Sequence, residues 1–130
     1  MGSKASKTTV NLDTAARLDI ICRKGDTFTL ALDFGKSIAD AATASSSEWE
    51  MDVRESDTAT GTVLNGTDFT YSITDGTATR SKLTITASAS TMNVTSGLYV
   101  YDLQQTTSAS VVKTYLYGTF TVNEDVTVVS

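Results

Sequence analysis

The chain has 130 residues and a formal net charge of −5, with no His, no Pro and a single Cys. This length fits one domain with a core large enough to fold without a disulfide or a metal. The absence of His excludes His-dependent acid–base and nucleophilic catalysis and most transition-metal sites. Threonine and serine make up 39 of the 130 residues, and because β-branched Thr suits half-exposed strands, this composition favours a β protein.

The first predicted element is an amino-terminal arm, residues 1–16, followed by one β-sandwich domain over residues 17–130. From residue 3 onward the arm is small and polar, with Val10 and Leu12 as its only larger apolar side chains. These two residues alternate as in a strand, which predicts an assembly element that adds to the edge of a neighbour's sheet. A disordered tail without a role is the alternative.

Strands are predicted next, because apolar and polar side chains alternate with a period of two through the rest of the chain. Seven or eight short strands are expected within residues 17–23, 27–34, 48–55, 69–73, 82–86, 97–104, 111–117 and 119–122. Strands at this spacing, without a convincing helix, predict an all-β fold: an antiparallel, Ig-like β-sandwich. The alternation assigns to the core Phe28, Leu30, Leu32, Trp49, Met51, Val53, Leu83, Ile85 and Phe120.

The segments between the strands carry turn signals. Residues 24–26 are expected to form a turn, residues 36–47 a loop and residues 87–96 a turn or a short helical corner. Asn65-Gly66 and Asp75-Gly76 are favoured two-residue hairpin turns, because each partner tolerates a positive φ. Gly118 marks a bulge or a site of close packing.

Charge and cysteine usage restrict the partners and the chemistry. The ten Lys and Arg residues are scattered among fifteen Asp and Glu, so we predict neither a nucleic acid nor a membrane as partner. No segment resembles a secretory leader or reaches transmembrane length, so we expect a soluble protein without a cleaved leader. Cys22 lies in an apolar run and is interpreted as a buried structural thiol.

Carboxylate pairs are the only catalytic groups that this composition leaves open. Glu48, Glu50 and Asp52 alternate on one strand, a spacing typical of a solvated face. A glycosidase needs two carboxylates across a sugar-binding cleft, and the sequence shows no signal of such a cleft. We therefore predict that the protein is not an enzyme and has no catalytic, cofactor-binding or metal-binding residue. An acid-dependent glycan hydrolase is the competing class.

Four tyrosines form the most distinctive set of side chains in the last third of the chain. They occupy alternating positions on two strands that are expected to be neighbours. Tyrosine is favoured at protein interfaces, but cross-strand tyrosine pairs also stabilise sheets, and both interpretations stay open. The predicted interface residues are Val10, Leu12, Tyr99, Tyr101, Tyr115 and Tyr117.

The same part of the chain carries a family resemblance. Residues 97–104 (GLYVYDLQ), 117–122 (YGTFTV) and 125–127 (DVT) resemble a pattern of small tailed-bacteriophage proteins, G-x-Y-x-Y-D-L, then G-x-x-x-V, then D-V-T. Upstream, residues 23–28 (RKGDTF) resemble the G-D-T-F entry of these proteins, and residues 49–55 occupy the place of a strand that ends in Arg. The chain resembles the amino-terminal domain of phage baseplate upper proteins.

This resemblance implies a structural protein of the virion. Its expected role is a tail, neck or baseplate adaptor, present in many copies in a symmetric assembly, with portal, tail, fibre or major capsid proteins as partners. A capsid decoration (cement) protein that stabilises the head shell is the alternative, and a soluble host-directed inhibitor is a third possibility. The receptor-binding extension of baseplate upper proteins has no counterpart here, so host recognition is not implied.

Overall fold

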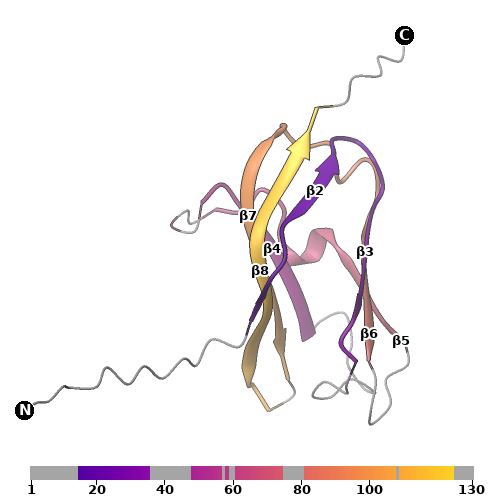
Figure 1. Cartoon of the computed structure of the whole chain (residues 1–130), viewed down its shortest axis with the longest axis vertical. Coiled ribbons are helices and arrows are strands. Elements are labelled where there is room, and N and C mark those ends of the chain that lie inside the picture. The colour runs from indigo at the N-terminus through magenta and orange to yellow at the C-terminus, as the bar shows by residue number, and fades with distance from the viewer. Residues whose placement is uncertain are drawn as a thin grey trace, which may run out of the picture.

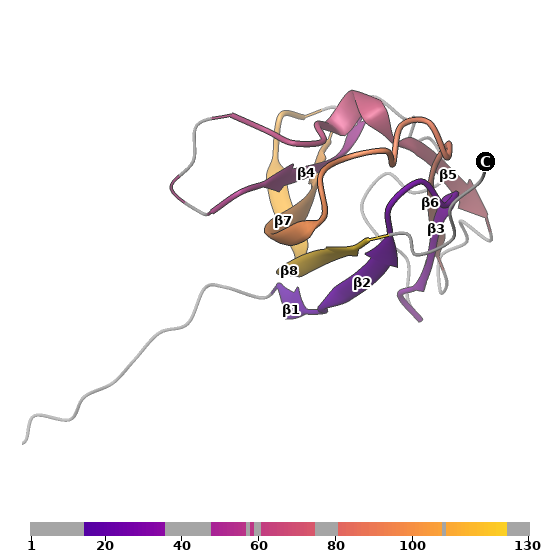
Figure 2. The same cartoon turned by 90° about the horizontal axis from the view of Figure 1, so that it is seen from above.

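The computed structural model describes residues 15–35, 48–56, 58, 61–74, 81–107 and 109–124. Eight strands in this part of the chain form two sheets that pack face to face (Figures 1 and 2). The predicted all-β sandwich is therefore confirmed. Several expectations fall outside the described residues: the arm with Val10 and Leu12, the loop over 36–47, the Asp75-Gly76 turn and the segment 125–127.

The five-stranded sheet combines the two ends of the described chain. Strands β4 (Trp49–Arg54), β7 (Gly97–Thr106) and β8 (Val112–Asn123) pair antiparallel in the order β4-β7-β8. Strands β1 (Ala16–Arg17) and β2 (Ile20–Arg23) follow one another along the free side of β8, and both pair with it in parallel. The sheet is thus mixed rather than purely antiparallel, and strand pairing starts one residue before the predicted domain boundary.

The three-stranded sheet is antiparallel, with the order β3 (Phe28–Asp33), β6 (Lys82–Ala87) and β5 (Thr70–Thr74). The predicted turn between β2 and β3 is present and takes the chain from one sheet to the other. Gly25 in this turn has φ +78°, a left-handed conformation that Gly adopts without steric cost.

The hydrophobic core lies between the two sheets and follows the predicted alternation. Seven of the predicted core side chains are at most 5% exposed, namely Phe28, Trp49, Met51, Val53, Leu83, Ile85 and Phe120. Leu30 and Leu32 are half-buried and pack against this cluster, because β3 is an edge strand of its sheet. Met92, in the predicted corner before β7, is fully buried.

The Asn65-Gly66 pair does not form the hairpin turn predicted for it. Asn65 instead caps a short 3₁₀ helix, η2 (Gly66–Asp68). Its side-chain oxygen accepts a hydrogen bond from the N–H of Thr67 at 3.0 Å, and the Asp68 carboxylate accepts one from the N–H of Asn65 at 2.9 Å. This capping box satisfies the backbone donors that a helix start leaves free, which favours the helix over the tight turn.

No helix in the part of the chain that the structure describes is long and apolar enough to cross a membrane.

Candidate functional site

The outer face of the five-stranded sheet, turned away from the core, arranges its side chains in rows across the strands. The strand register places one charged row from β1 to β4, which we call the first row: Arg17, Tyr117, Asp102 and Asp52. Alternating residues of a strand share a face, so these outward residues lie between the inward ones that form the core.

Two further rows follow toward the end of β8. The second row has charged residues at both ends: Asp19, Thr119, Val100 and Arg54. Strand pairing places Thr119, Val100 and Arg54 side by side. Asp19 joins the row because its carboxylate accepts a hydrogen bond from the N–H of Thr119. The third row is largely apolar and consists of Ile21, Thr121 and Leu98. The side chains of Ile21 and Leu98 are 71% and 66% exposed, so water covers apolar surface at this end of the face.

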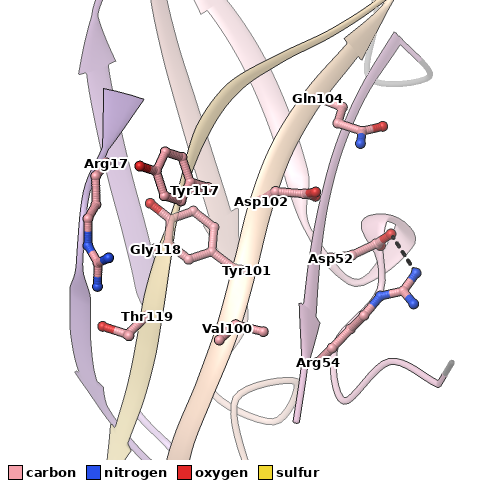
Figure 3. A pocket seen from close by; sticks show the side chains of 10 residues that line it. All are labelled: Arg17, Asp52, Arg54, Val100, Tyr101, Asp102, Gln104, Tyr117, Gly118 and Thr119. Carbon is pink, nitrogen blue, oxygen red and sulfur yellow. Dashed lines mark ion pairs between the residues drawn. The ribbon is translucent and has the colours of Figure 1, made fainter. Parts of the chain in front are cut away.

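The first two rows, except Asp19, line a hollow of about 570 Å³, together with Tyr101, Gln104 and Gly118. Figure 3 shows Arg17 at one side of this hollow and the Arg54–Asp52 ion pair at the other, with Tyr117 and Asp102 between them. The hollow therefore offers cationic, aromatic and acidic groups from four neighbouring strands.

The acidic side of the hollow carries more negative than positive charge, because Arg54 stands among Asp52, Asp102 and Glu50. Asp52 and Asp102 are direct cross-strand partners, and like charges placed opposite each other destabilise a sheet. Burial raises the pKa of Asp102 above its usual range, and the neighbouring Asp52 carboxylate raises it further. Burial and Asp52 also raise the pKa of Glu50, on the same face of β4. A positive charge brought to this place would relieve the repulsion.

Asp52 is nevertheless held in position. Its Oδ1 accepts a hydrogen bond of 2.8 Å from the N–H of Gly66 at the start of η2. Its Oδ2 lies 3.9 Å from Nη2 of Arg54, which is at the outer limit of an ion pair. The helix start orders this carboxylate, while Arg54 neutralises it weakly.

Arg17 is positioned by the break between β1 and β2. At this break the N–H of Leu18 donates to the carbonyl oxygen of Tyr117 at 2.9 Å. The Asp19 carboxylate takes the place of a backbone acceptor and receives the N–H of Thr119 at 3.0 Å and Nε of Arg17 at 3.2 Å. The hydrogen bond from Thr119 is the main cause that lowers the pKa of Asp19. Arg17 thus stands beside the hollow with 58% of its side chain exposed.

Gly118 allows the segment between β1 and β2 to approach β8 closely. The sequence predicts a bulge or close packing at this glycine, and the structure shows the close packing. A Cβ at this position would collide with the carbonyl oxygen of Leu18, and it would lie 2.9 Å from Oδ1 of Asp19. The side chain of Tyr101, the cross-strand partner of Gly118, donates its hydroxyl to the same Leu18 carbonyl at 2.6 Å. Burial raises the pKa of Tyr101 to about 12.

The four tyrosines, which the sequence places at alternating positions of two neighbouring strands, do not share one surface in the structure. Tyr99 and Tyr101 are buried between the sheets. A β-bulge leaves Tyr115 without a cross-strand partner, and its ring packs inward against Phe34 and Trp49 at centroid distances of 5.3 and 5.5 Å. Only Tyr117 of this set points outward, with 39% of the residue exposed. The bulge adds a residue to one strand and so interrupts the alternation used to group them.

Sequence reasoning missed most of the residues that line the hollow. The spacing of Asp52 predicts a solvated face, but only 19% of its side chain is exposed. Arg17, Arg54 and Asp102 are not among the predicted site residues at all. Each stands at a polar position of an alternating strand, which is a visible signal, but their neighbourhood depends on the pairing of strands that are far apart in sequence.

The remaining reactive groups in the described part of the chain show no second site. Cys22 is half-buried, its thiol donates a weak hydrogen bond to the Thr121 carbonyl at 3.6 Å, and burial raises its pKa. A raised pKa keeps this thiol protonated and weakly nucleophilic. Among the described residues, no group of three or more His, Cys, Asp or Glu side chains could hold a metal ion.

Comparison with known proteins gives a likeness of fold only. No family model matches the sequence, and no curated protein matches it. Among solved structures, the chain is similar to CopC from Methylosinus trichosporium OB3b, with a TM-score of 0.44 and 13% sequence identity over 90% of this chain and 91% of that one. At this identity and score, nothing beyond the sandwich architecture is transferred to this chain.

These findings correct the family assignment made from the sequence. No family or curated match supports a bacteriophage protein, and CopC is a solved structure that aligns over nearly the whole chain. The resemblance to baseplate upper proteins was therefore wrong, and so were the predicted virion function, virion partners and virion location that followed from it. Short motifs such as G-x-Y-x-Y-D-L describe an alternating strand with a turn before it, and many β proteins contain such strands.

Proposed function

We propose that this chain is a non-catalytic protein-binding domain that recognises its partner with the outer face of the five-stranded sheet. The observation that carries the proposal is the coincidence, on one face, of the exposed apolar residues Ile21 and Leu98 with the charged hollow around Asp102. Exposed apolar surface next to polar groups marks interaction sites. Tyrosine and arginine are the residue types enriched at such sites, and Tyr117, Arg17 and Arg54 line the hollow.

The opposite face of the sandwich lacks these features. Outward positions of β3, β6 and β5 in the three-stranded sheet are mainly small and polar, as at Thr29, Thr84, Thr86 and Ser72. Such a face is well solvated and offers no apolar anchor. Of the two outer faces, the five-stranded sheet is the one suited to a protein partner.

The partner is expected to bring a basic side chain to the acidic side of the hollow. Asp52 and Asp102 repel each other directly, so a guanidinium or ammonium group between them replaces repulsion with attraction. The net charge of −5 also attracts a basic partner over longer distances and speeds encounter.

Titration with a blocked tripeptide that has a central arginine tests this proposal. ¹⁵N NMR shifts are expected at residues of the hollow, such as Asp102, Tyr117 and Thr119, and not at Thr84 on the other sheet. A tripeptide with citrulline, which is neutral, is expected to cause no shifts. The variant D102N is expected to lose the response, while D33N, which removes the same charge from the other sheet, keeps it.

Several results would contradict this function. The proposal is wrong if the citrulline peptide binds as well as the arginine peptide, or if D102N responds like the wild type. Shifts spread over both sheets would show nonspecific attraction to an acidic protein. Turnover of a polysaccharide that is lost in D102N would refute the non-catalytic part.

A further inference from the structure

We infer that the partner of this face is a second copy of the chain. The two outer faces meet across a two-fold axis that runs parallel to the strands, between β7 and β8. This inference rests on the proposed function, because it names the partner of the same face. A two-fold interface brings the same patch of both copies together, so the patch must be complementary to itself.

The charges of the face satisfy this requirement. In the first row, the positive Arg17 stands on the β1 edge, and the negative Asp52 stands on the β4 edge beside Asp102. In the second row the order is reversed, with Asp19 on the β1–β2 edge and Arg54 on the β4 edge. The four corners of the face therefore alternate in sign.

Rotation about the proposed axis places the β1–β2 edge of one copy over the β4 edge of the other. Because the axis is parallel to the strands, each row lies over the same row of the other copy. Arg17 of one copy then lies over Asp52 of the other, beside Asp102, and Asp19 lies over Arg54. Symmetry forms each of these contacts twice. The negative charge that raises the pKa of Asp102 in the single chain receives a partner in the pair.

The apolar third row selects this axis over the alternative. A two-fold axis perpendicular to the strands, between the first and second rows, would also bring opposite charges together. It would, however, place Leu98 over the polar row of Gln104 and Glu50, which are cross-strand partners below the first row. The parallel axis instead places Leu98 of each copy over Thr121 of the other, next to Ile21, so that the apolar residues of the two copies meet in one row.

The size of the face predicts a weak and salt-sensitive pair. Strands about 4.8 Å apart and same-face residues about 6.8 Å apart give a flat area of roughly 400 Å² for four strands and three rows. Stable complexes bury about 800 Å² on each partner. Exposed ion pairs are screened at high ionic strength, where the Debye length falls to about 3 Å at 1 M salt. Dimers should therefore form at high protein concentration and low salt.

Sedimentation velocity of the full chain over a range of protein concentrations tests the pair. We expect a concentration-dependent dimer at low salt that dissociates in about 1 M NaCl, where charges are screened. R17E places a glutamate opposite Asp52, and D102K adds a lysine beside the place that Arg17 of the other copy occupies. Each variant is expected to weaken association at least about 10-fold, which corresponds to about 1.4 kcal/mol.

Mixing the two variants gives the decisive measurement. In a mixed pair, the introduced glutamate lies over Asp52 and beside the introduced lysine, and the native Arg17 lies over Asp52 and beside the native Asp102, so the heterodimer is expected to associate more tightly than either variant with itself. K113E makes the same charge change as R17E on a residue outside the outward rows, beside Tyr115 and Leu116, and should dimerise normally. Circular dichroism of every variant verifies the fold.

The outcomes separate this inference from the proposed function. A chain that stays monomeric while the arginine peptide still binds overturns the second copy as partner and leaves the binding face intact. A dimer that R17E and D102K do not weaken, or whose two variants associate no more tightly when mixed, uses another surface and also overturns the inference. Absence of both dimer and peptide binding refutes the inference and the proposed function together.

Discussion

Replacement of Gly118 by alanine tests the contact that holds the edge of the binding face. The added Cβ would collide with the carbonyl oxygen of Leu18 and would lie 2.9 Å from both the carbonyl carbon of Leu18 and Oδ1 of Asp19. Two of these atoms belong to the backbone, so no side-chain rotation relieves the clash. The β1–β2 segment must move away from β8.

The cost can be estimated from the hydrogen bonds at this point. Displacement of the segment breaks the bond from Leu18 N–H to Tyr117, the bond from Thr119 N–H to Asp19, and the bond from the Tyr101 hydroxyl to Leu18. At about 1 kcal/mol for each bond, G118A should lower the free energy of unfolding by about 3 kcal/mol. For a domain of this size that corresponds to a fall in Tm of roughly 10 °C.

Urea denaturation followed by circular dichroism measures this loss, with G61A as the matched control. No atom lies within 4 Å of the position that a Cβ at Gly61 would take, so G61A should change the free energy of unfolding by no more than about 0.5 kcal/mol or stabilise slightly. If G118A also stays within about 0.5 kcal/mol of the wild type, the close approach of Leu18 to β8 is refuted.

Further changes give sharper tests of single contacts. Y71F removes a hydroxyl that accepts a hydrogen bond from the N–H of Met51 and donates one to the Gly66 carbonyl, both at 2.8 Å in the core. Because these buried groups lose their partner, the free energy of unfolding from urea denaturation should fall by about 2–3 kcal/mol. A change near zero would contradict the two hydrogen bonds. Y101F removes the hydroxyl that donates to the Leu18 carbonyl and should lower the free energy of unfolding by about 1 kcal/mol. Because the pKa of Asp102 is raised in the fold, its ionisation opposes folding as pH rises above the usual aspartate range. D102N should therefore be more stable than the wild type at pH 7 by up to about 1 kcal/mol, with the difference vanishing below about pH 4; equal pH profiles would contradict it. Deletion of residues 2–14, which belong to the arm predicted from the sequence, should leave the urea midpoint unchanged. A lowered midpoint would place those residues in the folded domain.

The predicted secondary structure was wrong at two places where an acidic side chain accepts a backbone hydrogen bond that the local sequence pattern does not indicate. Asn65-Gly66 has the composition of a tight turn, but Asp68 three residues after Asn65 completes a capping box and starts a 3₁₀ helix. The strand predicted over residues 17–23 is broken at Leu18 and Asp19, because the Asp19 carboxylate replaces a backbone acceptor for Thr119. In both places a short acidic side chain competes with the regular backbone pattern.

The fold class and most of the core follow from the amino-acid sequence alone. Alternation along Trp49–Arg54 and Lys82–Ala87 identifies strands and their buried sides without knowledge of any neighbour, because the side-chain period of a strand is a local property. Composition is equally independent of strand pairing, so the absence of His excludes whole classes of chemistry whatever fold the chain adopts.

Which outward residues meet is a property of the tertiary structure. Asp52 and Asp102 are far apart in sequence and become direct neighbours through the register of β4 and β7, and Arg17 joins them only because β1 adds to the far side of β8. A bulge at Tyr115 turns that ring into the core while Tyr117 stays outside. Register and bulges depend on how whole strands pack against one another, and a shift by one residue reverses every side chain of a strand. No local pattern contains that information.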